Sequence, residues 1–364
     1  MTQLLSPKKT FFGVQALRGL AALLVVAHHS TQLWSVRMHP ASASLGWGNG
    51  AAGVDIFFVI SGFVMALTGM GSRPMLATTF LRRRFVRVVP MYWLCTVLAI
   101  ASLAMRYRSA LSGRHELGFL HVLASFLFLP TRNIAGQVAP VLAVGWTLSY
   151  EMFFYLIFAL ALALAANPVR LLIPLMIAIS CIGAIHRDSW PAITVLTQPI
   201  ILEFLAGSLL GYAVLKHRQW NPLLLGILGP LGLAVLLLVP RSNDLSRPLV
   251  WGLPAFLIVS ATVMLESRLA PFIPRWLLRI GDASYSLYLI HLFVLNPLTT
   301  ISPRIPVLLH SETAFVLAGL ASSTLIALVV YRFLEVPLTL WLTRNQRLPP
   351  PAVIVLGEHI ETTH

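Results

Sequence analysis

Two kinds of ionisable residue interrupt an apolar stretch near the amino terminus, residues 14–30, which reads VQALRGLAALLVVAHHS. Arg18 lies near its start, and the pair His28 and His29 lies near its end. In an α-helix, eleven residues come within about 20° of three full turns, so Arg18 and His29 share one face. They would lie ~16 Å apart along the axis. That face would carry a permanent cation at one end and a titratable base at the other.

Further ionisable and hydroxyl groups lie within other apolar stretches: Asp55, Ser61, Glu151, Glu203 and His291. Such groups are costly in hydrocarbon, so each is by default a candidate functional residue. The alternative for a carboxylate is structural, because a buried one must be paired or protonated. For Ser61 the alternative is helix packing, since small residues allow helices to approach closely.

Four arginines, Arg82, Arg83, Arg84 and Arg87, precede Pro90, which is expected to begin an apolar span. They could be an ordinary positive flank on the cytoplasmic side of a membrane helix. However, all four are arginine and none is lysine, and arginine is suited to bidentate phosphate recognition. The run therefore also predicts a site for a phosphorylated cytosolic ligand.

The composition is that of a polytopic membrane protein. Of 364 residues, 57% are hydrophobic and 10% are charged, and the mean hydropathy is +0.82, whereas soluble domains carry about 25% charged residues. The net charge of +14 does not indicate nucleic-acid binding, because the positive residues punctuate apolar segments. Attraction of cytoplasmic flanks to anionic lipid explains most of them. Cys95 and Cys181 form no metal-binding spacing.

Apolar stretches of about 17–25 residues predict an all-α fold of about ten transmembrane helices. They cover residues 14–33, 50–69, 90–106, 141–165, 170–187, 196–216, 221–240, 249–266, 281–302 and 313–341. The run 117–130 is expected to be an interfacial or re-entrant helix. The first helix contains Arg18 and no small-x-small site follows it, so we expect it to be retained. The Pro-interrupted tail, residues 343–364, is expected to be cytoplasmic and loosely ordered.

The distribution of Lys and Arg favours both termini in the cytoplasm, with fifteen on the inner side against nine outside. Under this topology the inner groups are Arg18, Arg82–Arg87, Asp282, Arg332 and Glu335, and the middle to outer groups are His29, Asp55, Glu151, Glu203 and His291. These groups would form a polar path across the membrane, with cations at its cytosolic mouth and acidic and basic groups deeper in. Two classes of function fit such a path. One is a transporter of an anionic or proton-coupled solute. The other is a group-transfer enzyme that takes an activated donor from the cytosol. No metal site is expected, since the candidate ligands are scattered.

Six blocks in order resemble membrane acyltransferase family 3, and more narrowly its exopolysaccharide-production acetyltransferase branch. They are RGLAALLVVAHH, GVDIFFVISGFVM, FLRRRFVRVVPMYW, WTLSYEMFFYLIF, EFLAGSLLG and GDASYSLYLIH. The resemblance covers roughly residues 11–342, which we expect to form the transmembrane acyltransferase domain. It implies a bacterial inner-membrane enzyme that moves an acetyl or other short acyl group from cytosolic acyl-CoA to a carbohydrate hydroxyl, at a lipid-linked stage or on the polymer.

The resemblance also implies roles for individual residues. Arg84 and Arg87, with Arg82 and Arg83 beside them, would hold the phosphates of acetyl-CoA, and Ser61 belongs to the same cofactor-binding set. Arg18 would position or neutralise the donor, or stabilise a developing thiolate or oxyanion. His29 would be the general base or form an acyl-histidine. Glu151 or Asp55 would orient its ring, and His28 duplicates the histidine of the motif.

Overall fold

The computed structural model describes residues 11–39, 47–71, 75–109, 118–133, 136–165, 167–187, 189–240, 243 and 245–344. Within these ranges the regular structure is helical, and the β pairing recorded is one isolated bridge between Arg132 and Val138. The all-α prediction is therefore confirmed for this part of the chain. Apart from its first two residues, the predicted tail 343–364 lies outside the described residues.

The α-helices follow the apolar stretches of the sequence. They are α1 (Phe12–Leu33), α2 (Gly53–Gly69), α3 (Ala77–Ser109), α4 (Phe119–Phe126), α5 (Trp146–Leu164), α6 (Pro168–Ala184), α7 (Leu202–Leu215), α8 (Pro222–Leu238), α9 (Leu253–Met264), α10 (Glu266–Leu269), α11 (Arg275–Asp282), α12 (Ser284–Ile301), α13 (Pro306–His310), α14 (Glu312–Val330) and α15 (Val336–Arg344). Two π-helical turns, η6 (Pro248–Gly252) and η9 (Tyr331–Glu335), lead into α9 and α15.

Five helical segments of the described chain are long and apolar enough to cross a membrane: Phe12–Met38, Gly48–Gly69, Ala77–Met105, Ala143–Leu164 and Glu312–Arg344. A sixth is present if Pro248–Met264 and Glu266–Phe272, bent by 72°, count as one span. α6, α7 and α8 are shorter apolar helices. Each of the ten predicted stretches contains a helix, but only five or six meet the length of a span. The chain is thus an integral membrane protein with fewer clear spans than the sequence predicted.

The arginine run lies inside a helix and not ahead of one. α3 has 33 residues, Ala77–Ser109, with Pro90 inside it, so the helix begins thirteen residues before the proline at which the sequence placed the start of the span. Proline is tolerated in membrane helices when neighbouring groups compensate for the lost hydrogen bond. As a result, Arg84 and Arg87 lie about one helical turn apart on α3.

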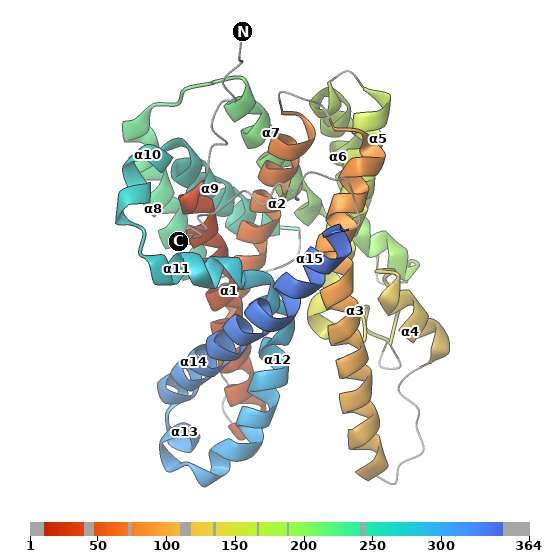
Figure 1. Ribbon diagram of the computed structural model, residues 1–364, viewed down its shortest axis with the longest axis vertical. Coiled ribbons are helices and arrows are strands. Elements are labelled where there is room, and N and C mark those ends of the chain that lie inside the picture. Colours follow the sequence, from red (N-terminus) through yellow and green to blue (C-terminus); the bar gives the residue numbers. More distant parts are fainter. Residues whose placement is uncertain are drawn as a thin grey trace, which may run out of the picture.

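α1 is held at both its beginning and its side. The carboxylate of Glu266 accepts the backbone N–H groups of Phe12 (2.6 Å) and Gly13 (3.0 Å), which occupies donors that an N-terminus otherwise leaves free. Gly281 of α11 lies against the backbone of Gln15, where a Cβ would collide with the Gln15 carbonyl. α1 also packs against α2, α12 and α14. Figure 1 shows it among these helices.

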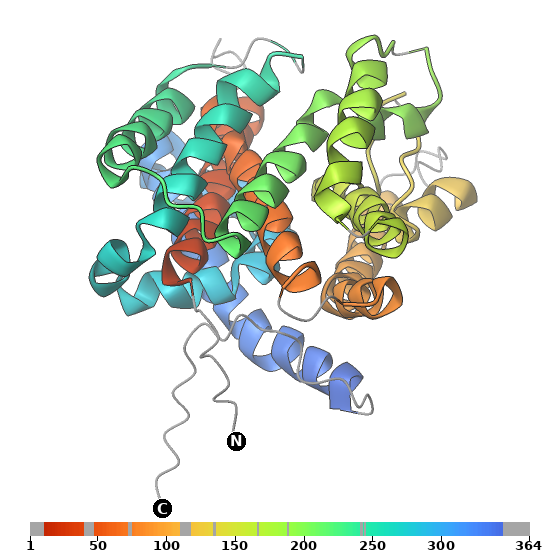
Figure 2. The ribbon, with the colours of Figure 1, turned by 90° about the horizontal axis from the view of Figure 1, so that it is seen from above.

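α2 and α7 cross with their backbones in close contact. A Cβ at Gly62 would collide with the carbonyl of Phe204, and one at Gly207 with the carbonyl of Val59. Small residues at such points let backbones touch. Viewed from above, α2 and α7 lie between the group formed by α3–α6 and the group that contains α1, α8, α9 and α12 (Figure 2). The crossing of α2 and α7 therefore joins these two groups of helices.

Candidate active site

Arg84 is the arginine of the run that points into the bundle. Its Nη2 donates to the hydroxyl of Thr68 at 2.6 Å, and its guanidinium lies over the rings of Phe80 (5.3 Å) and Tyr155 (5.8 Å). Arg87 is exposed one turn further along α3, beside Arg84. Of the other two, Arg82 is exposed and Arg83 is half-buried. Together they present several guanidinium groups at one end of the helix.

Glu151 lies at this arginine end. Its Oε1 accepts the hydroxyls of Ser61 (2.8 Å) and Tyr155 (2.5 Å), and it lies within electrostatic range of Arg84 and Arg18. The sequence had grouped Glu151 with the histidines at middle to outer depth. The structure instead links it to the arginines, with Ser61 bound to it.

Arg18 extends the same polar cluster onto α1. Its Nη1 donates to the amide oxygen of Gln15 at 3.3 Å, and the amide nitrogen of Gln15 donates to Asp282. Arg87, Glu335, Asp282 and Glu151 all lie within its electrostatic range. Glu335 in turn accepts the Ser286 hydroxyl at 2.5 Å. Arg332, predicted at this depth, is exposed. Five helical segments and both charge signs thus meet around Arg18.

The opposite end of α1 carries a histidine cluster. The rings of His28 and His29 have centroids 5.0 Å apart, and the ring of His291, from α12, lies 5.0 Å from that of His29. The Nδ1 of His29 is 3.0 Å from the carbonyl oxygen of Val25. Because a carbonyl can only accept, Nδ1 carries the proton and Nε2 carries a lone pair. His29 is half-buried, so this lone pair belongs to a base that a reactant can reach.

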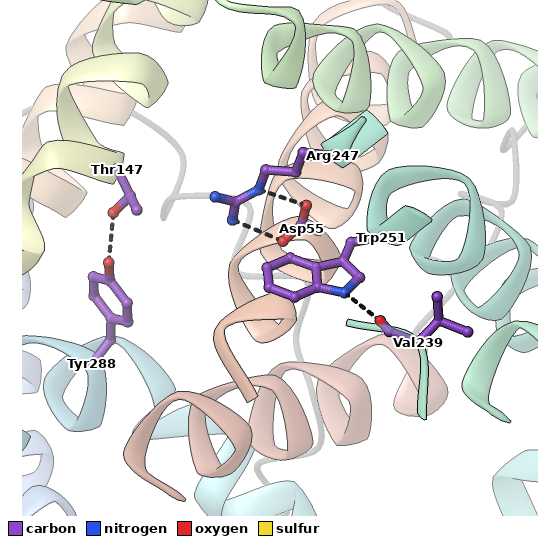
Figure 3. A network of polar contacts seen from close by, with 6 residues as sticks. All are labelled: Asp55, Thr147, Val239, Arg247, Trp251 and Tyr288. Carbon is purple, nitrogen blue, oxygen red and sulfur yellow. Dashed lines mark hydrogen bonds and ion pairs between the residues drawn. The ribbon is translucent and has the colours of Figure 1, made fainter. Parts of the chain in front are cut away.

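Asp55 is committed to an ion pair. Its two oxygens accept from Nε and Nη2 of Arg247, both at 2.9 Å, and both side chains are buried. Trp146 and Trp251 flank the Arg247 guanidinium at 5.6 and 5.4 Å. Figure 3 shows the pair, with Trp251 beside it and Thr147 and Tyr288 across from it. Neither Asp55 nor Glu151 is the recorded partner of the His29 ring, whose orientation is set by the Val25 carbonyl.

Glu203 completes the Asp55 cluster. It is buried in the first turn of α7 and interacts electrostatically with both Asp55 and Arg247. Two carboxylates facing one guanidinium in a buried setting require a proton to balance the charge. This cluster is best explained as the structural link between α2, α7 and η6.

Arg247 also lines a cavity of about 260 Å³, which Trp146, Tyr150 and Gln198 share. The Tyr150 hydroxyl lies 2.9 Å from Oε1 of Gln198 and donates to the Val195 carbonyl at 2.6 Å. Arg247 is also within electrostatic range of His28 and Tyr288 at the histidine end. An aromatic wall with a few polar groups is typical of a small-molecule site.

Sequence reasoning missed Arg247 and Tyr288. Arg247 was assigned to an outer loop by its position between spans, and nothing in its spacing indicated a buried partner. Tyr288 hydrogen-bonds to Thr147 (2.8 Å), lies 6.1 Å from the His291 ring, and is within electrostatic range of Glu151. It therefore connects the arginine end to the histidine end. Its place three residues before His291 on an apolar helix was the available signal.

Among the described residues, no group of three His, Cys, Asp or Glu side chains could hold a metal ion.

A helical membrane protein whose buried polar residues lead from guanidinium groups to a reachable base has the features of a membrane-embedded group-transfer enzyme. Residues 11–332 match the family model described as an acyltransferase domain. The chain therefore belongs to membrane acyltransferase family 3, as the six sequence blocks indicated.

Three curated relatives show the range of the similarity. The exopolysaccharide production protein ExoZ of Rhizobium meliloti is 36% identical over 303 residues, which cover 79% of this chain and 89% of ExoZ. The acyltransferase MdmB of Streptomyces mycarofaciens is 26% identical, covering 77% of this chain and 78% of MdmB. The peptidoglycan O-acetyltransferase OatA of Listeria monocytogenes is 24% identical, covering 89% of this chain and 55% of OatA. No solved structure matches the chain.

Proposed function

We propose that this protein is an O-acyltransferase that moves an acetyl or other short acyl group from acyl-CoA to a hydroxyl of an exopolysaccharide or another surface glycan. The proposal rests on the positions of Arg18 and His29 at opposite ends of α1. Other charged side chains, including the guanidinium group of Arg87, surround Arg18, and the imidazoles of His28 and His291 lie beside His29. The names of ExoZ and OatA support a polysaccharide acceptor.

The arginine end would bind the donor. CoA carries phosphates, and charge-assisted bonds from guanidinium groups suit phosphate oxygens. Arg87 and Arg82 are exposed at this end, whereas Arg84 lies deeper. The phosphates would therefore meet Arg82, Arg83 and Arg87 first, and Arg84 would stand where the pantetheine arm enters. Ser61 and Tyr155 would keep Glu151 in place beside that entrance.

Arg18 would act on the donor and not on the reacting carbonyl. The carbonyl must lie near the base during attack, and Arg18 is ~16 Å from His29 along the helix axis. A side chain at that distance cannot also supply the oxyanion contact at His29. The same distance is comparable to much of a pantetheine arm, which supports a donor that spans from Arg18 to His29.

His29 would act as general base. Its Nε2 would take the proton of the acceptor hydroxyl while the oxygen attacks the acyl carbonyl and the C–S bond to CoA breaks. The proton would then pass to the departing thiolate, so the enzyme returns to its starting state. The alternative is an acyl group carried on Nε2 of His29, and the lone pair at that atom serves either route. The cavity lined by Trp146, Tyr150 and Gln198 would hold the acceptor.

The orientation follows from the donor's location. Acyl-CoA is cytosolic, so the arginine end would face the cytoplasm and both termini would lie there, as expected for ten spans in a bacterial inner membrane. The remaining spans would come from the shorter apolar helices α6, α7 and α8 and from α12. A lipid-linked repeat unit held at the outer side would be the acceptor.

Acyl transfer and transport are separated by one experiment. Purified protein is incubated with acetyl-CoA and with saccharide extracted from cells that lack the enzyme, and both CoA release and O-acetyl groups are measured, the latter by NMR. The proposal predicts both products and their loss in His29→Ala. Solute flux in proteoliposomes with no acyl chemistry would contradict it and favour the transporter.

A further inference from the structure

His291 is the most deeply buried ionisable residue at the histidine end. Its relative exposure is 0%, and its ring lies 5.0 Å from that of His29, with the two planes inclined at 57°. Neither the family resemblance nor the sequence reasoning gave it a role beyond its depth. His291 is therefore a titratable neighbour that another helix, α12, brings close to His29.

The tautomer of His291 follows from its hydrogen bond. Nδ1 lies 3.2 Å from the carbonyl oxygen of Leu287, so Nδ1 must be the donor and Nε2 must carry a lone pair. That Nε2 is buried and has no hydrogen-bond partner within the part of the chain that the structure describes. An unsatisfied buried acceptor costs ~1–3 kcal/mol, and such an atom in a folded protein requires an explanation.

The same arrangement occurs at His29, whose Nδ1 donates to Val25 and whose Nε2 keeps its lone pair. Two neighbouring imidazoles are therefore both set to accept a proton, and neither supplies one to the other while both are neutral. The missing donor appears when one ring becomes an imidazolium, because both of its nitrogens then carry N–H groups.

We propose that His291 is a positioning residue that shares the proton His29 takes from the acceptor hydroxyl. This inference rests on the proposed function. When Nε2 of His29 becomes N–H, the lone pair on Nε2 of His291 accepts it and stabilises the imidazolium. The proton balance is unchanged: the O–H bond breaks, the ester C–O bond forms, the C–S bond breaks, and the proton finally leaves with the CoA thiol.

The groups that surround His291 are consistent with this role. From α1, His29 and His28 interact with it electrostatically. From its own helix, Tyr288 lies 6.1 Å away, with its hydroxyl bound to Val144 and Thr147. The charged groups beyond are Arg247 and Glu151, which interact with Tyr288. Among these described groups no carboxylate pairs with the imidazole of His29 or His291. We therefore expect a proton on His29 to be stabilised by the ring of His291.

The test compares His291→Phe, which keeps a ring but no acceptor, with His291→Gln, which restores an acceptor oxygen. Inverted membrane vesicles carrying each full-length variant receive radiolabelled acetyl-CoA, and label in the endogenous saccharide fraction is measured from pH 3.5 to pH 9. His310, which is exposed at the end of α13, provides the matched control variants His310→Phe and His310→Gln.

We expect His291→Phe to lower the maximal rate by about 10²-fold, a typical contribution for assisted proton transfer. The acidic limb of the pH–rate profile of this variant should move to lower pH, because the imidazolium of His29 forms less readily without Nε2 of His291 as its acceptor. The maximal rate of His291→Gln should be at least tenfold higher than that of His291→Phe, and the KM for acetyl-CoA should be unchanged. A His291→Phe profile that keeps the wild-type acidic limb, or equal losses in Phe and Gln at normal protein levels, would overturn the proposal. Absence of label in wild-type vesicles would instead contradict the proposed function itself.

Discussion

At the arginine end of α1, charged groups of both signs surround Arg18, including Arg87, Glu335, Asp282 and Glu151. At the histidine end, the rings of His28, His29 and His291 bind backbone carbonyls through Nδ1, and the nearest charged pair is the internally balanced Asp55–Arg247. The arginine end thus contains permanently charged side chains, whereas the histidine end contains imidazoles that would gain charge only during the reaction.

This difference assigns different kinetic consequences to the two ends. Fixed charges that meet a ligand in its ground state mainly set affinity, whereas a group that gains charge only during reaction sets the rate of the chemical step. Substitutions at the arginine end should therefore raise KM for the donor, and substitutions at the histidine end should lower kcat. The predictions below test this separation in order of expected effect.

His29→Ala should lower kcat by about 10²–10⁴-fold, because the group that takes the hydroxyl proton is removed. KM for acetyl-CoA should stay within about twofold. Initial rates of label transfer from acetyl-CoA into saccharide provide the measurement, with His310→Ala as the matched histidine control. A KM effect that exceeds the kcat effect would place His29 with the donor and break the comparison.

Asp55→Ala should destabilise the fold by about 3–5 kcal/mol, because it leaves the buried guanidinium of Arg247 without its carboxylate. Thermal unfolding of detergent-purified protein measures this loss. The double variant Asp55→Ala with Arg247→Leu should recover part of it. If Asp55→Ala unfolds like the wild type yet loses activity, Asp55 acts on the reaction and not on the structure.

Arg84→Lys should raise KM for acetyl-CoA roughly tenfold, since a lysine keeps the charge but loses the planar fork and its place over Phe80 and Tyr155. The value of kcat at saturating donor should be unchanged. Arg170→Lys, on α6 outside the cluster, is the matched control, and measuring rates against acetyl-CoA concentration separates the two constants. An unchanged KM would remove Arg84 from the donor site.

Ser61→Ala should have the smallest effect, about fivefold or less, because it removes one hydrogen bond to Glu151 worth ~1 kcal/mol. The effect should be a rise in KM for acetyl-CoA, since Glu151 belongs to the arginine end. Ser102→Ala, whose exposed hydroxyl binds only its own helix in the described contacts, is the control. A change confined to kcat would move Ser61 and Glu151 to the histidine end.

The sequence predicted the all-helical membrane character and the family, because apolar length and ordered motif blocks are local properties. It also placed Arg18 and His29 at opposite ends of one helix, since helical geometry relates positions on a single element. It did not identify Arg247, because its partner Asp55 lies 192 residues away in the sequence. The count of about ten spans is not confirmed, because helices such as α7 are apolar but shorter than the other candidate spans of the described chain.

The central claim is that the arginine end binds the donor and the histidine end performs the transfer. Its most direct test is the Kd of acetyl-CoA for purified wild-type protein, His29→Ala and the double variant Arg84→Ala with Arg87→Ala, measured by titration calorimetry beside saccharide acetylation. We predict wild-type affinity without acetylation for His29→Ala, and at least tenfold weaker binding for the double variant. Acetylation by well-folded His29→Ala, or wild-type affinity in the double variant, would contradict the claim.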